Sequence, residues 1–218
     1  MPEGFASYGR ILHPARAYDP LRWIRWSELA ARRGVTVTTE TTFEQASGFA
    51  PQSGPVDGID EPSDGSVPEH LVAKLAEFLH GWTTTPSACW FGMWDGNGTW
   101  WKGAHGVIPY DEPEADLEEW QRIDDERDRV LRATPTFGTP QRQYFLMSGP
   151  LSAARALTDA AGGSSPNLWW PQDRVSLVST EVDGFSTYIG GSASMIDALM
   201  VSPTVEAVRT SVNTPIAY

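Results

Sequence analysis

Residues 174–200 read RVSLVSTEVDGFSTYIGGSASMIDALM, and this stretch predicts a strand, a turn, a second strand and a helix in succession. Residues 174–182 and 185–190 are rich in apolar and β-branched side chains, and the Asp-Gly pair between them is typical of a tight turn. We therefore expect an antiparallel hairpin. The following helix should begin near Ser194, because Ser194 and Asp197 form a capping pattern.

Segments before this stretch predict further strands and helices. Apolar residues recur at helical spacing in four of them, and they alternate or cluster as strand residues do in three others. The order of these elements predicts an α+β fold, with an antiparallel sheet of four to six strands and helices packed mainly on one face. The expected helices are 20–33, 68–80, 114–132 and 151–161, and the expected strands are 35–43, 143–148 and a hairpin that starts at 89–94.

The composition of residues 51–67 divides the chain. This segment consists mostly of Pro, Gly, Ser and Asp, which leave almost nothing to bury, so we expect a flexible linker. It would separate an N-terminal helix and strand segment, residues 1–50, from a main α+β domain, residues 68–218.

The overall composition excludes several classes of protein. The 218 residues include 16 basic and 28 acidic side chains, and a chain with a net charge of −12 repels phosphate backbones, so we expect no nucleic-acid partner. No apolar run approaches the roughly 18 residues that a membrane span needs, so we expect no membrane partner. The single Cys89 and the lack of a signal-peptide pattern in residues 1–20 predict a cytoplasmic protein.

Half of the net negative charge lies in one short segment. Residues 111–132 contribute a net charge of −6. Two interpretations stay open. The segment can be a solvated helix face that aids solubility, or an acidic surface that attracts a basic protein partner.

The sequence contains no recognised catalytic, cofactor-binding or metal-binding motif. It lacks the nucleophile-elbow, P-loop and zinc-protease patterns, and its four histidines are scattered. Cys89 beside Trp90 is typical of a small buried residue rather than of a nucleophile. We therefore expect a protein without a cofactor, and the sequence gives no positive evidence for an enzyme.

The densest group of candidate binding residues is PNLWWPQDR, residues 166–174. Trp169 and Trp170 are flanked by prolines and followed by Asp173 and Arg174, which is typical of a rigid aromatic platform for a ligand or partner. The alternative is that both rings cover the edge of the sheet.

A second interpretation places these residues in a pocket. Glu181 shares its strand parity with Leu177, so it can face inward, and it would then need a donor such as Arg142 or Arg174. A buried carboxylate there would be a candidate general acid or base. The pocket would be lined by Trp94, Trp169, Trp170 and Tyr188, with Asp173, Arg174 and Glu181 as its polar groups.

Four motifs together resemble a family of uncharacterised cytosolic proteins of actinobacteria. They cover most of the chain from residue 68 onward, and 14 of the 16 basic residues are Arg, as is typical of a GC-rich bacterium or its phage. The resemblance implies no particular activity. The motifs are WFGMWDG at 90–96, RQYFLMSGP at 142–150, PNLWWPQDR at 166–174 and STYIGGS at 186–192.

More loosely, an acidic α+β chain with aromatic strands and an Asn-Gly turn resembles the SUKH (Smi–Knr-type) superfamily. Bacterial members of that superfamily are immunity proteins that bind toxins, so this resemblance implies a protein partner.

The leading hypothesis is a cytoplasmic, cofactor-free protein–protein interaction module with an immunity-like role. Its contacts would be the acidic segment 111–128 and the surface formed by Trp169, Trp170, Asp173 and Arg174. Its partner would be another protein, and the acidic segment would favour a basic one. One alternative is a small-molecule-binding protein or enzyme with a tryptophan-lined pocket. Another is a structural, self-assembling protein of phage type, which would form homo-oligomers through an extensive interface.

Overall fold

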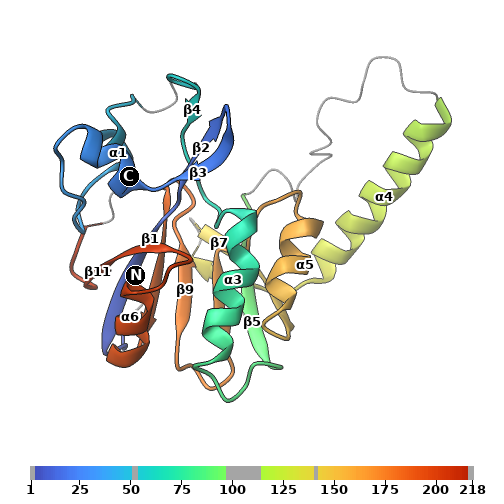
Figure 1. Cartoon of the computed structure of the whole chain (residues 1–218). Coiled ribbons are helices and arrows are strands. Elements are labelled where there is room, and N and C mark those ends of the chain that lie inside the picture. Colours follow the sequence, from blue (N-terminus) through green and yellow to red (C-terminus); the bar gives the residue numbers. More distant parts are fainter. Residues whose placement is uncertain (1–2, 51–53, 97–113, 140–141, 216–218) are drawn as a thin grey trace.

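The predicted hairpin lies inside an eight-stranded antiparallel sheet. The computed structural model describes residues 3–50, 54–96, 114–139 and 142–215 (Figure 1). Strands β9 (Leu177–Thr180) and β10 (Ser186–Gly191) pair antiparallel. The cap of helix α6 (Ala193–Met200) lies two residues earlier than expected: the hydroxyl of Ser192, not Ser194, accepts a hydrogen bond from the N–H of Met195 at 3.1 Å.

The sheet has the strand order β11-β1-β10-β9-β8-β5-β7-β6, and all neighbouring strands are antiparallel. The α+β fold class is therefore confirmed, although the sheet has more strands than the four to six expected. The remaining strands are β1 (Ser7–Leu12), β5 (Cys89–Trp94), β6 (Thr136–Thr139), β7 (Arg142–Gly149), β8 (Leu168–Pro171) and β11 (Glu206–Thr210).

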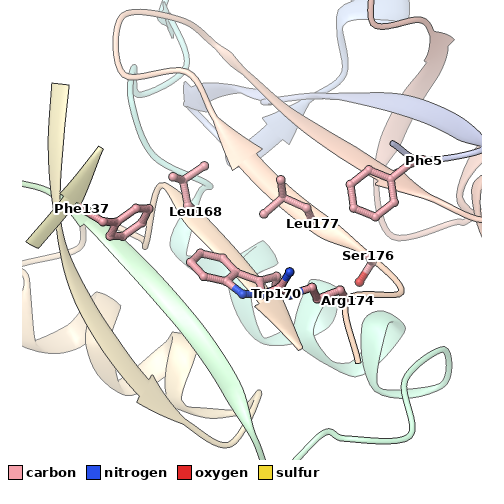
Figure 2. Close-up of a pocket in the computed structure, with 7 residues that line it drawn as sticks. All are labelled: Phe5, Phe137, Leu168, Trp170, Arg174, Ser176 and Leu177. Carbon is pink, nitrogen blue, oxygen red and sulfur yellow. The ribbon is translucent and has the colours of Figure 1, made fainter. Parts of the chain in front are cut away.

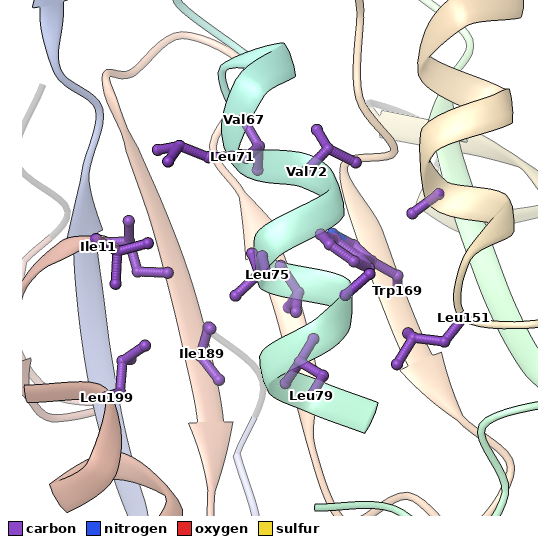
Figure 3. Close-up of a cluster of buried hydrophobic side chains, with 14 of the residues drawn as sticks. Ile11, Val67, Leu71, Val72, Leu75, Leu79, Leu151, Trp169, Ile189 and Leu199 are labelled. Carbon is purple, nitrogen blue, oxygen red and sulfur yellow. The ribbon is translucent and has the colours of Figure 1, made fainter. Parts of the chain in front are cut away.

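Helices α3, α5 and α6 cover one face of this sheet (Figure 1). Helices α3 (Glu69–His80) and α5 (Ala153–Ala160) correspond to two predicted helices. Between the helices and the sheet lies the main core, where α3 packs over buried side chains from β1, β5, β8, β9 and β10 (Figure 3). Its members include Ile11, Leu71, Val72, Leu75, Leu79, Phe91, Trp169, Val178, Ile189 and Leu199.

Helix α4 (Glu114–Ala133) is the third predicted helix and extends away from the sheet (Figure 1). Its last turn is attached to the body, because Leu131 is buried with Met93, Phe145 and Ala161.

A smaller sheet replaces the first predicted helix. Strands β2 (Ala15–Tyr18) and β3 (Leu21–Ile24) form a hairpin, and only α1 (Trp26–Arg32) is helical. The prediction of a helix from residue 20 is therefore wrong. The cause is a distant contact: the carboxylate of Glu206 in β11 accepts hydrogen bonds from the N–H groups of Trp26 (2.7 Å) and Ser27 (2.8 Å), and so caps the helix there.

The predicted strand 35–43 is also wrong. The buried Arg10 of β1 donates hydrogen bonds to the carbonyl groups of Thr39 (2.8 Å) and Thr41 (2.9 Å), which takes these groups out of any strand ladder. Thr42 then forms a capping box with Gln45, which starts the short helix α2 (Phe43–Ser47).

Residues 54–67 contain ordered structure next to both sheets. Strand β4 (Ile59–Asp60) pairs with β2, and Val67 is buried in the main core. Strand β1, from the first part of the chain, lies within the large sheet. The predicted division of the chain into two folding units, residues 1–50 and 68–218, with a linker at 51–67, stays a prediction. The second strand of the hairpin expected after 89–94 lies outside the described residues.

A polar chain crosses the core beside the loop before α3. His13 is fully buried, and because a carbonyl oxygen can only accept, its Nδ1–H donates to Ser63 at 3.4 Å. Nε2 then accepts from the hydroxyl of Thr187 at 2.8 Å, and Thr180 lies 2.8 Å from the same hydroxyl. Burial lowers the pKa of His13 to about 3, opposed by the Ser63 carbonyl and aided by the charge of Arg10. The imidazole is therefore neutral at physiological pH.

We expect Trp169→Ala to destabilise the protein far more than Trp170→Ala. Trp169 is 1% exposed under α3, so its loss leaves a cavity that costs about 3–5 kcal/mol. Trp170 points to the opposite face and is half-buried, so its loss should cost less than about 1.5 kcal/mol. Urea unfolding of the two variants measures the difference, and equal losses would contradict this arrangement of the strand.

We expect His13 to make stability fall in mild acid. Between about pH 6.5, the usual pKa of histidine, and pH 3 the unfolded chain binds a proton that the folded protein does not. The free energy of unfolding should therefore decrease by up to about 1.4 kcal/mol per pH unit as the pH falls through this range. Urea unfolding at several pH values should show a smaller slope for His13→Gln. The exposed His80→Gln is the control, and it should keep the slope of the wild type.

Candidate functional site

The candidate site is a groove on the face of the sheet opposite α3. Neighbouring residues of a strand point to opposite faces, so Trp169 enters the core while Leu168 and Trp170 of β8 lie in the groove. Leu177 of β9 contributes to the same surface. Trp90 pairs with Trp170 across β5 and β8, which extends the aromatic row by one strand.

Two glycines allow aromatic rings to lie against this face. A Cβ atom on Gly92 of β5 would come within 2.9 Å of the ring of Phe137, and one on Gly190 of β10 would come within 2.4 Å of the ring of Phe5. Both rings therefore pack directly on strand backbone. Phe137 also meets Trp170 edge to face, with ring centroids 5.8 Å apart. The two phenylalanines form opposite ends of the groove (Figure 2).

The groove is open and mostly apolar. Its volume is about 390 Å³, and a second hollow of about 240 Å³ shares Trp170 and Arg174 with it. The two hollows therefore form one continuous surface. Leu168 and Leu177 lie along one side of the main hollow, and Trp170, Arg174 and Ser176 lie along the other (Figure 2). The second hollow adds Trp90, Leu146 and Gln172.

Arg174 is the cationic residue of the groove. It follows β8 in a left-handed backbone conformation, with φ of +54°, which is unfavourable for a residue with a side chain. Its backbone is fixed, because its N–H donates to the carbonyl of Pro171 at 3.0 Å. Within the described part of the chain, the exposed guanidinium of Arg174 has no hydrogen-bond or ion-pair partner.

The neighbouring carboxylate does not neutralise Arg174. Asp173 accepts hydrogen bonds from the hydroxyls of Thr83 (2.8 Å) and Thr84 (2.9 Å) and from the N–H of Thr84 (2.8 Å). Partial burial alone would raise the pKa of Asp173, but these hydrogen bonds outweigh it, and the pKa is lowered. Asp173 is therefore an ionised anchor for the turn and not a general acid at neutral pH.

Ser176 is the other polar side chain of the groove. The residue is 2% exposed, and its hydroxyl makes no hydrogen bond with the described residues. It lies on the same side of the groove as Arg174 (Figure 2). The groove thus combines apolar walls with two unused hydrogen-bonding groups.

The other residues predicted from the sequence lie apart from this groove. Trp169 is in the core, so the two tryptophans do not form the shared platform expected from the sequence. Tyr188 is buried opposite Arg10 in the β1–β10 pair. Trp94 borders a separate polar hollow of about 320 Å³, together with Asn167 and Asp183.

Glu181 has a hydrogen-bond donor, as we expected for a carboxylate that faces inward from its strand. Arg142 donates to its carboxylate at 2.6 Å and also lies 3.3 Å from Asp183. The side chain of Glu181 is only 12% exposed. The hydrogen bond with Glu181 raises the pKa of the Arg142 guanidinium, which therefore stays charged. This pair joins β7 to the end of β9, which is a structural role.

No catalytic centre is evident in the part of the chain that the structure describes. Burial, reinforced by Asp173, raises the pKa of Cys89 to about 11, so its sulfur is a thiol and a poor nucleophile at neutral pH. Over the described residues, no group of three or more His, Cys, Asp or Glu side chains could hold a metal ion. The helices within these residues include none whose length and apolarity would suffice to cross a membrane.

Sequence reasoning identified Trp170 and Arg174 but missed most of the groove. The missed residues come from distant segments, and the signal that could have found them is the glycine inside a strand, which often marks a close approach of another group. Gly92 and Gly190 both have this property. The missed groove residues are Phe5, Phe137, Leu168, Ser176 and Leu177.

Comparisons with known proteins found no relative of this chain. A scan against protein-family models found no match, and searches of curated proteins and of solved structures found no significant match either.

We expect Arg174→Gly to stabilise the protein slightly while it removes the cation from the groove. Glycine adopts the left-handed conformation without steric cost, so the free energy of unfolding should rise by up to about 1 kcal/mol. Urea unfolding of the variant measures this. Val175→Gly, at the neighbouring exposed position with no positive φ, is the control and should not be stabilised. A destabilised Arg174→Gly variant would show that the arginine side chain contributes to the fold.

Proposed function

We propose that this protein is a cofactor-free, cytoplasmic protein-binding module, and that the open groove receives an extended apolar segment of a partner protein. The observation that supports this most strongly is the row of half-buried Trp90, Trp170 and Leu177 on a face that α3, α5 and α6 leave open. Contiguous apolar surface with a tryptophan near its centre is typical of binding surfaces.

The shape of the groove favours a chain segment over a small substrate. Its two hollows share Trp170 and Arg174 and lie open across several strands. An enclosed pocket would bury most of a small ligand, whereas an open groove suits an occupant that continues beyond it. The ionised Asp173 also supplies no general acid for an enzyme.

The overall charge agrees with the immunity-like role that we include in this proposal. A net charge of −12 would speed the encounter with a basic toxin and make the association rate depend on salt. In α4, the exposed Glu126 pairs with Arg129, and Asp128 pairs with Arg132. This helix is a second candidate contact with such a partner.

A second candidate function is the binding of a small apolar molecule. The volume of the main hollow, about 390 Å³, lies within the range of about 300–1,000 Å³ that ligand pockets occupy. A third candidate is self-association through the same face. Both candidates are outcomes of the test below.

A selection from a random-peptide display library tests the proposal. Peptides enriched on the wild type should contain apolar or aromatic residues, and Trp170→Ala should weaken their binding about tenfold or more, as expected for a central tryptophan. The matched control is Trp23→Ala, because Trp23 is 46% exposed on the β2–β3 hairpin and lies outside the groove.

Three other results would contradict the proposal. Peptides that bind Trp170→Ala as well as the wild type would place the binding surface elsewhere. A dimer of the wild type that Trp170→Ala dissociates, measured by sedimentation, would identify a second copy as the occupant. If no peptide is enriched and a metabolite raises the melting temperature of the wild type only, the small-molecule function replaces the proposed one.

A further inference from the structure

We infer that the groove recognises a carboxylate together with an apolar side chain: the bound segment places an Asp or Glu side chain against Arg174 and Ser176. This inference rests on the proposed function and names the chemistry of the partner segment. It concerns the local charge of that segment, so it is compatible with a partner that is basic overall.

The first support is that the guanidinium of Arg174 is unused. All five of its N–H donors lack a partner among the described residues, and the side chain is exposed at the point that the two hollows share. Most other arginines among the described residues form a hydrogen bond or an ion pair. Arg22 pairs with Glu28, Arg142 with Glu181, and Arg155 with Glu69 and Asp159. In a chain with excess carboxylates, an arginine without one is available for a carboxylate from outside.

The second support is the hydroxyl of Ser176. A 98% buried residue normally uses its hydroxyl in an internal hydrogen bond, and Ser165, Ser66 and Thr158 do so here. Ser176 does not, yet it borders the groove next to Arg174. A hydroxyl can donate to a carboxylate oxygen, so the two side chains together offer donors to both oxygens of one carboxylate.

The third support is that the turn holds Arg174 in place at a cost. The left-handed backbone conformation is unfavourable for arginine, and glycine would avoid the strain. Hydrogen bonds from Thr83, Thr84 and Val175 to Asp173 fix the preceding residue, so the turn is rigid before any ligand binds. Backbone strain that persists at the edge of a groove is typical of a binding site, and the rigid turn fixes where the Arg174 side chain begins.

The chemistry of the groove favours a carboxylate over a phosphate. One guanidinium and one hydroxyl can neutralise and bind a single negative charge, whereas a phosphate dianion would remain undercompensated in a protein of net charge −12. The apolar walls formed by Leu177, Trp170 and Phe5 meanwhile require an apolar neighbour for the anion.

The test is to run the same peptide selection on the wild type and on Arg174→Asn. Asparagine tolerates the left-handed backbone, so this variant removes the charge with little strain, and its folding is checked by circular dichroism. Peptides enriched on the wild type should carry Asp or Glu beside an apolar residue, and those enriched on Arg174→Asn should not.

The strongest wild-type peptide is then measured in its acidic form and in its amide form, with Glu changed to Gln or Asp to Asn. The acidic form should bind the wild type about tenfold more tightly than the amide form. This difference should disappear in Arg174→Asn and become smaller in Ser176→Ala. Arg174→Lys keeps a positive charge, so it should retain part of the difference. The inference is overturned if the wild type binds the acidic and the amide form with equal affinity, so that the double-mutant cycle shows no coupling between Arg174 and the carboxylate.

The outcomes separate the inference from the proposed function. Peptides without acidic residues that still need Trp170 would overturn the inference and leave the proposed function standing. No enrichment on the wild type would remove the proposed function. Whether the groove instead binds a small apolar anion is tested with 8-anilinonaphthalene-1-sulfonate and its uncharged analogue N-phenyl-1-naphthylamine. If only the anion binds, in an Arg174-dependent way, and no peptide does, the commitment to a protein segment is wrong.

Discussion

The alternation of side chains along β8 is the constraint on which the rest of the structure depends. Because successive residues of a strand face opposite sides, burial of Trp169 under α3 forces Leu168 and Trp170 onto the other face of the sheet. A shift of one residue in the pairing with β5 would exchange these two surfaces. The same contact therefore anchors the core and creates the groove.

The groove also depends on what the sheet leaves out. Gly92 and Gly190 give no side chain to the open face, so the rings of Phe137 and Phe5 occupy that space and bound the apolar surface between them. Glycine weakens a strand, but β5 and β10 each lie between two paired neighbours, which offsets the loss. The loss of strand stability caused by glycine is thus confined to two positions, and at both of them an aromatic ring packs where the side chain is missing.

The elements with strong local signals could be predicted from the sequence, and those set by distant contacts could not. Helix α3 follows from its apolar spacing, and the β9–β10 hairpin follows from the Asp-Gly turn. Helix α1 begins at Trp26, where Glu206 caps it from 180 residues away in the sequence. In the site, Trp170 and Arg174 stood out by composition. Ser176 and Phe5 did not, since their roles come from the tertiary arrangement.

The position of Arg174 links stability to binding. An arginine with positive φ costs the fold free energy, and its charge gains nothing from Asp173, whose carboxylate is occupied by Thr83 and Thr84. Those same hydrogen bonds hold the turn rigid, so little backbone entropy is lost when a partner binds. Backbone strain persists only when the surrounding structure stabilises it, and the core under α3 lies directly across β8 from the groove. The groove can therefore keep a cation beside apolar walls, because the opposite face of the neighbouring strand β8 is so well buried.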